Sequence, residues 1–203
     1  MQTMNDQTPA MGALPENYQE VLSWKVTGKP IRVIVLNVFG VILFVIFGMI
    51  FSSIAIRVGK LPSDGNLQFG LGEMGLAIAG IVVTFVLHEL THGLVMQLFG
   101  AKPKYGIIWK GLMLYATSPG YAYRRNNYVV IALAPFLFIS ALVILGMWIL
   151  QGIAWVALLA ICGVVNASGA VGDMWITMIV LRYAAMAYVM DERDGIRVFL
   201  PKP

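Results

Sequence analysis

Four long apolar segments, separated by short polar stretches, dominate the chain. They lie near residues 31–56, 72–99, 128–150 and 153–181. Each is long enough to cross a hydrocarbon core of roughly 30 Å, which takes about 20 helical residues. The pattern predicts an all-α membrane protein whose four transmembrane helices form one domain, residues 31–182, between a polar N-terminal segment, residues 1–30, and a C-terminal tail, residues 183–203.

The longest polar connection, residues 100–127, contains two aromatic and aliphatic runs, Tyr105 to Trp109 and Leu112 to Thr117, which flank Lys110-Gly111. Glycine between two such runs is typical of a short β-hairpin. An amphipathic segment lying on the membrane surface explains the same pattern equally well. Both interpretations of this loop remain open from sequence.

Composition agrees with a membrane protein. Hydrophobic residues make up 59% of the chain and charged residues only 12%, whereas about a quarter of the residues of a soluble domain are charged. The N-terminal segment lacks the basic start and apolar core of a secretory signal, so we expect the first span to direct insertion. The basic residues gather at span ends and form no stripe with aromatic residues, so nucleic acid is not an expected partner.

The distribution of basic residues predicts the orientation. Lys and Arg number three before or at the start of the first span, two after it, five in the 100–127 loop, none between the last two spans and four after the last span. Twelve of the fourteen therefore lie on one side, and the positive-inside rule places both termini and the 100–127 loop in the cytoplasm.

The motif His88-Glu89-Leu90-Thr91-His92 lies inside the second apolar segment and contains the only two histidines of the chain. Residues four apart share one face of a helix, so both imidazoles can bind one metal ion while Glu89 stands beside them as a base. This spacing predicts a Zn²⁺ site. The alternative is a pair of hydrogen-bonded core histidines.

Asp173 is the candidate for the third metal ligand that a zinc hydrolase requires. The histidine motif lies about ten residues before the end of its span, roughly 14 Å of helix, and Asp173 lies at nearly the same depth in the last span. The alternative is a polar clasp with Asn166 or Thr177. Asn166 is seven residues before Asp173 and on the same helical face, where it could donate to a substrate oxyanion or, more simply, form an interhelical hydrogen bond.

Three other features shape the expected packing. Small residues around Asp173, and Gly93 just after the motif, predict a close approach of the two helices. Pro135 predicts a kink in the third span. Cys162 is the single cysteine, which excludes an intrachain disulfide and a cysteine zinc cluster.

The residues His88 to Gly93, followed two spans later by Asn166 and Gly172-Asp173, resemble the site-2 protease group of intramembrane zinc metalloproteases. Over roughly residues 70–182 the chain is also similar to a small, mostly bacterial membrane family described as putative zincin peptidases. That family has a four-span core, a Tyr/Pro-rich loop like Tyr115 to Tyr121, and a Gly-Asp in the last span. The resemblance implies a peptidase of the bacterial cytoplasmic membrane.

These observations lead to the hypothesis of a zinc-dependent intramembrane or membrane-proximal peptidase. His88, His92 and Asp173 would hold Zn²⁺, and Glu89 would be general base and then general acid. The partner would be an extended segment of a membrane protein, held by edge pairing along residues 105–117. The alternative functions are a structural metal site, a proton or ion relay, or a pseudoenzyme that binds metal without cutting. Oligomeric state and substrate identity are not predicted.

Overall fold

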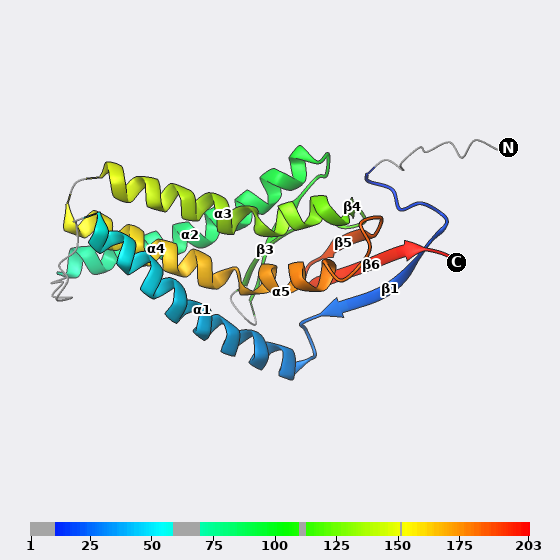
Figure 1. Cartoon of the computed structure of the whole chain (residues 1–203), viewed down its shortest axis with the longest axis horizontal. Coiled ribbons are helices and arrows are strands. Elements are labelled where there is room, and N and C mark those ends of the chain that lie inside the picture. The colour runs from blue at the N-terminus through cyan, green and yellow to red at the C-terminus, as the bar shows by residue number, and fades with distance from the viewer. Residues whose placement is uncertain (1–10, 59–69, 110–112, 151) are drawn as a thin grey trace.

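The four predicted spans correspond to five helices in the computed structural model, which describes residues 11–58, 70–109, 113–150 and 152–203 (Figure 1). The helices are α1 (Pro30–Arg57), α2 (Leu71–Leu98), α3 (Arg125–Ile149), α4 (Ile153–Gly169) and α5 (Val171–Val180). Among the described residues, four helical segments are long and apolar enough to cross a membrane, with α4 and α5 together forming the fourth. The chain is therefore a membrane protein, as predicted.

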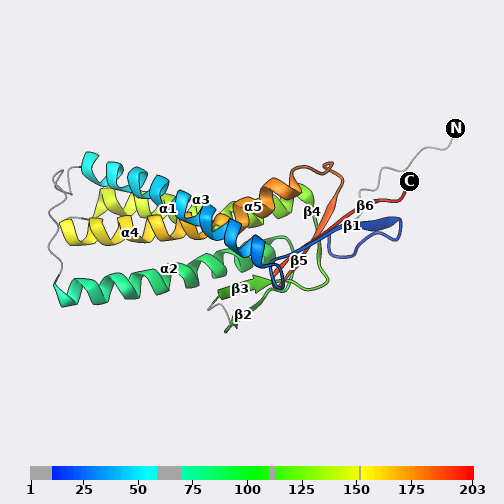
Figure 2. The same cartoon turned by 90° about the horizontal axis from the view of Figure 1, so that it is seen from below.

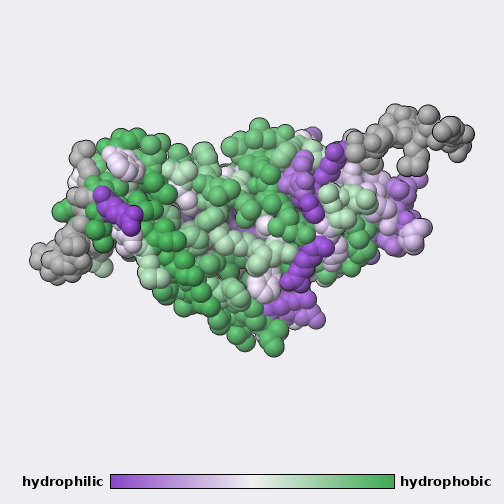
Figure 3. Space-filling view, viewed as in Figure 1, coloured by the Kyte–Doolittle hydropathy of each residue, from purple (hydrophilic) through white to green (hydrophobic). Residues whose placement is uncertain are grey.

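Among the described helices, α4 buries the largest share of its residues. This helix packs against α1, α2 and α3, whereas α1 buries only Phe51 and Ala55. Exposed leucine, isoleucine, valine and phenylalanine side chains form an apolar surface over most of the helical part on the face shown in Figure 3. Such a surface is stable in lipid and would be unstable in water.

The fourth span is not one continuous helix. It breaks at Ala170, directly after Gly169, and α5 begins at Val171. Asp173 consequently lies in the first turn of α5, where the partial positive charge of a helix N-terminus favours a carboxylate. The predicted span of residues 153–181 is confirmed in its length, but it consists of two helices instead of one.

The prediction of an all-α fold was wrong beyond the helices. Four antiparallel strands form a sheet in the order β1-β6-β5-β4: β1 (Tyr18–Lys25), β6 (Gly195–Pro201), β5 (Tyr188–Glu192) and β4 (Ala122–Arg124). The sheet joins the N-terminal segment to the residues predicted as a tail, at one end of the helices (Figure 1). Apolar side chains of the sheet pack into one core with α2, α3 and α5; they include Trp24, Tyr123, Val189, Ile196 and Val198.

The hairpin interpretation of the 100–127 loop is confirmed. Strand β2 (Lys104–Ile108) pairs with β3 (Met113–Thr117), and Figure 2 shows this hairpin beside the C-terminal end of α2. The predicted turn at Lys110-Gly111 lies outside the described residues. A Cβ atom on Gly93 would overlap the Tyr105 hydroxyl, so Gly93 makes room for the hairpin and not, as predicted, for the helix that carries Asp173.

Candidate metal centre

Both histidines lie on one face of α2, one turn apart and buried, with their ring centroids 5.0 Å apart. Asp173 approaches them from α5. Its Oδ2 lies 3.0 Å from Nε2 of His88, and its Oδ1 lies 3.4 Å from Nε2 of His92. One potential ligand atom from each of the three residues lies within 4.8 Å of the others. The structure therefore brings together the residues that the spacing and depth arguments paired.

The opposite nitrogen of each imidazole is bound to an oxygen acceptor. His92 Nδ1 lies 2.9 Å from the main-chain oxygen of Ile131, and His88 Nδ1 lies 3.0 Å from Oδ1 of Asn166. Because both partners can only accept, each Nδ1 carries the hydrogen and donates it. In the neutral imidazole this hydrogen on Nδ1 leaves the lone pair of Nε2 facing Asp173, which is the tautomer that metal-binding histidines adopt.

This arrangement fits a divalent metal. Two Nε2 atoms and two carboxylate oxygens face one another, and such acceptors repel unless a proton or a metal ion lies between them. Two imidazoles and one carboxylate form a ligand set used by catalytic zinc, which keeps its fourth position for water. His88, His92 and Asp173 are therefore the residues that would hold the ion.

Asn166 is fully engaged in supporting this cluster. Its Oδ1 accepts the His88 hydrogen bond, and its Nδ2 lies 3.3 Å from the main-chain oxygen of Pro135 and 3.4 Å from that of Phe136. The side chain is buried. Of its two predicted roles, the interhelical hydrogen bond is the one this geometry supports.

Glu89 is partly exposed and stands beside the cluster without joining it. Its carboxylate accepts a hydrogen bond from the main-chain N–H of Ala116 in β3. This contact ties the motif helix to the hairpin and fixes the carboxylate next to the candidate ligands.

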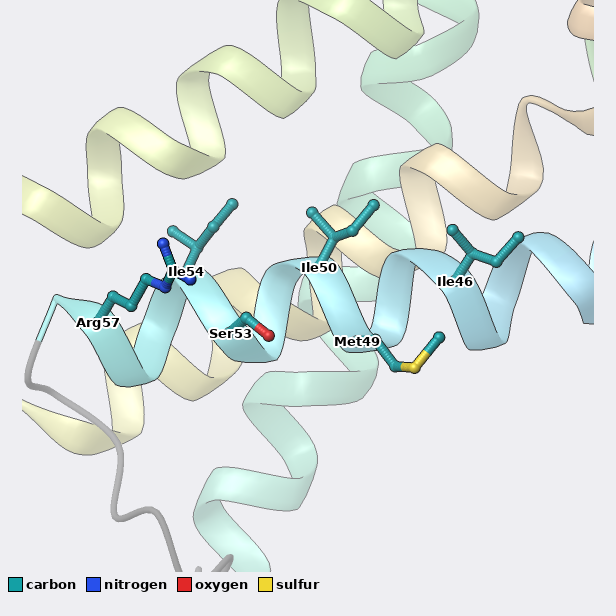
Figure 4. A pocket seen from close by; sticks show the side chains of 6 residues that line it. All are labelled: Ile46, Met49, Ile50, Ser53, Ile54 and Arg57. Carbon is teal, nitrogen blue, oxygen red and sulfur yellow. The ribbon is translucent and has the colours of Figure 1, made fainter.

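The cluster opens into a large cleft of about 1440 Å³. One wall is the N-terminal half of α1, and the other comprises α2 and β3, with α5 carrying Asp173 between them. A second hollow, of about 360 Å³, lies on the C-terminal half of α1; Figure 4 shows Arg57 there among largely apolar side chains. Of these two hollows, the large cleft is the one that combines histidine and carboxylate side chains from several elements.

The turn that joins β5 to β6 also lines the large cleft. In this turn region, Oδ1 of Asp191 accepts a 2.7 Å hydrogen bond from the hydroxyl of Tyr128 in α3. Burial raises the pKa of Asp191 to about 6. No local pattern in the sequence indicated this contact, because its partners are 63 residues apart.

Comparison with protein families gives an independent line of evidence. The sequence matches the family described as "Putative zincin peptidase" over residues 81–188. No curated protein and no solved structure matches the chain. The matched region contains the histidine motif, the hairpin, Asn166 and Asp173, and it covers more than half of the chain. The chain therefore belongs to the family of putative zincin peptidases.

Proposed function

We propose that the protein is a zinc-dependent peptidase that cuts a membrane protein within or beside the bilayer. The observation that carries the proposal is the convergence of His88 Nε2, His92 Nε2 and the Asp173 carboxylate beside Glu89, at the wall of one cleft. Glu89 stands beside this cluster without joining it, so its carboxylate is available as a base.

Zinc, when bound, supplies a Lewis acid that acidifies water and polarises a peptide carbonyl. Glu89 takes a proton from the attacking water and later delivers it to the leaving amine. The Ala116 N–H holds one side of this carboxylate, and a carboxylate has enough lone pairs to accept from water at the same time. The imidazole Nδ1 hydrogen bonds keep both rings oriented during these steps.

The substrate would bind as an extended strand along β3, because a helical substrate hides its carbonyls in its own hydrogen bonds. Backbone groups of a strand alternate between its two edges. Since the Ala116 N–H points to Glu89, the backbone groups of Leu114 point to the same cleft edge, and those of Tyr115 point toward β2. A strand added at this edge places its peptide groups beside Glu89.

The surroundings of the cleft favour a substrate segment from a membrane protein. Apolar side chains of α1, including Val33, Leu36 and Phe44, form the wall that faces β3. The charge distribution favours a cytoplasmic location for both termini, and the resemblance to a mostly bacterial family favours the bacterial cytoplasmic membrane.

Three variants test the proposal in purified, bilayer-reconstituted protein. Glu89→Gln should keep about one zinc per chain and abolish cleavage, because the metal is retained and the base is lost. Asp173→Ala should lose zinc. Glu73→Gln, the same substitution in the first turn of α2, is the matched control and should behave as the wild type.

Substrate identification uses the Glu89→Gln protein as a trap, followed by incubation of each captured membrane protein with the active wild type. The proposal fails if zinc-supplemented wild type contains no metal. It also fails if Glu89→Gln cleaves captured proteins as fast as wild type does; in that case metal retention would indicate a structural site.

A further inference from the structure

A proline lies one turn beyond the backbone group that holds His92. In a regular helix the carbonyl of Ile131 would accept a hydrogen bond from the N–H of residue 135. Residue 135 is proline, which has no N–H. The Ile131 carbonyl is therefore without its usual helical donor, and it accepts the Nδ1–H of His92 at 2.9 Å.

The next turn of α3 supports His88. The main-chain oxygens of Pro135 and Phe136 accept from Nδ2 of Asn166 at 3.3 and 3.4 Å. Oδ1 of Asn166 in turn holds Nδ1 of His88. His92 thus depends directly on the carbonyl that Pro135 frees, and His88 depends on the next turn of the same helix through the amide of Asn166.

These hydrogen bonds matter because the groups that form them are buried and cannot bind water instead. Pro135, Asn166 and both histidines are buried, and in a membrane segment a backbone group freed by proline must find another partner. A histidine donor satisfies that need, and the bond in turn fixes the tautomer that leaves Nε2 free.

We propose that Pro135 is a positioning residue of the metal centre, which frees the Ile131 carbonyl to orient His92. It acts through the backbone and touches neither metal nor substrate. The inference rests on the proposed zinc site, but it concerns how the site is built rather than which reaction it serves.

The test restores the missing N–H. Pro135→Ala gives Ile131 its helical donor, which competes with His92. We expect zinc affinity, measured by chelator competition, to fall about tenfold, the usual effect of losing a partner that orients a ligand. In the metal-free protein, the ¹⁵N resonances of His92 should move toward a mixture of tautomers, whereas loss of packing alone would leave the tautomer unchanged.

A second variant separates the missing N–H from the shape of the ring. Incorporation of lactic acid at position 135 gives a backbone ester, which lacks both the N–H and the proline ring. If the free carbonyl is what matters, the ester form should bind zinc within about twofold of wild type, since the Ile131 acceptor stays available. It also provides the test if the alanine variant does not fold.

Two results would overturn the inference. One is an alanine variant with wild-type zinc affinity and unchanged His92 resonances. The other is an ester form that loses as much affinity as alanine, which would assign the effect to the ring. Wild-type protein that binds no zinc would instead overturn the proposed function, so the two failures are distinguishable.

Discussion

Asn166 and His88 lie 78 residues apart in the sequence and share a buried 3.0 Å hydrogen bond between Oδ1 and Nδ1. Through this bond α4 orients a side chain of α2, while α5 supplies Asp173 to the opposite nitrogen of the same ring. The two halves of the fourth span thus act on one imidazole from opposite sides.

Removal of the Asn166 amide should weaken metal binding. Asn166→Ala leaves the Nδ1–H of His88 without an acceptor, and we expect zinc affinity to fall by about 10- to 100-fold. Chelator competition measures the change. Ser140→Ala is the control, because it removes one distant 3.4 Å partner of the same amide; equal losses in both variants would contradict the orienting role.

Proline scanning of the hairpin tests the proposed substrate edge. Leu114→Pro removes an N–H from the cleft edge of β3, and we expect cleavage efficiency to fall at least about tenfold, because a bulky ring also blocks strand addition. Ile107, its cross-strand partner in β2, presents its backbone to the opposite edge. The Ile107→Pro protein should therefore cleave a trapped substrate nearly as fast as wild type does. Equal losses of cleavage efficiency in the two proline variants would argue against binding along β3.

The contact between Gly93 and Tyr105 should be intolerant of a methyl group. Gly93→Ala places a Cβ where the Tyr105 hydroxyl lies, and overpacking of this kind costs about 1–3 kcal/mol. We expect a lower thermal unfolding midpoint and slower cleavage, because the hairpin that holds Glu89 is displaced. Adding Tyr105→Leu to Gly93→Ala should restore much of the unfolding midpoint and of the cleavage rate. If the double variant unfolds and cleaves like Gly93→Ala alone, the clash lies elsewhere.

Asp191 should make stability depend on pH in a defined direction. Its pKa rises on folding from 3.8 to about 6, so between these values the folded chain binds more protons than the unfolded chain. Stability should therefore fall as pH rises through this window and level off above about pH 6, with a total loss of about 3 kcal/mol.

Thermal unfolding of metal-free wild type and Asp191→Asn across this window measures that contribution. The asparagine keeps an acceptor for Tyr128 but does not titrate, so its stability should lack this part of the pH dependence. Identical pH profiles for the two proteins would exclude Asp191 as the source.

The helices were predictable because a helix that crosses the hydrocarbon core of a bilayer needs about 20 consecutive, mostly apolar residues. The predicted limits 31–56 and 72–99 differ from α1 and α2 by one residue at each end. The depth comparison between the histidine motif and Asp173 worked for the same reason, since residues at one depth in neighbouring helices can meet. The break at Ala170 was not predicted, because the hydropathy of the segment hardly changes there.

The four-stranded sheet was not predictable by the same reasoning. Its strands are short, and the pairing of β1 with β6 joins residues from opposite ends of the described chain, such as Tyr18 and Pro201. Such pairing leaves no local signature beyond a weak alternation. The support of His92 by Ile131 was equally hidden, because a main-chain carbonyl is the same in every residue; Pro135 was the available clue, and it was interpreted only as a kink.

The pairing of β1 with β6 sets an order of events during synthesis. Tyr18–Lys25 leaves the ribosome early, yet its neighbour in the sheet, Gly195–Pro201, follows only after all four spans. Chains are made from the N-terminus onward at about 5–20 residues per second, so β1 has no partner strand until β6 has been synthesised. The nascent chain therefore cannot complete its cleft before its four spans have been made.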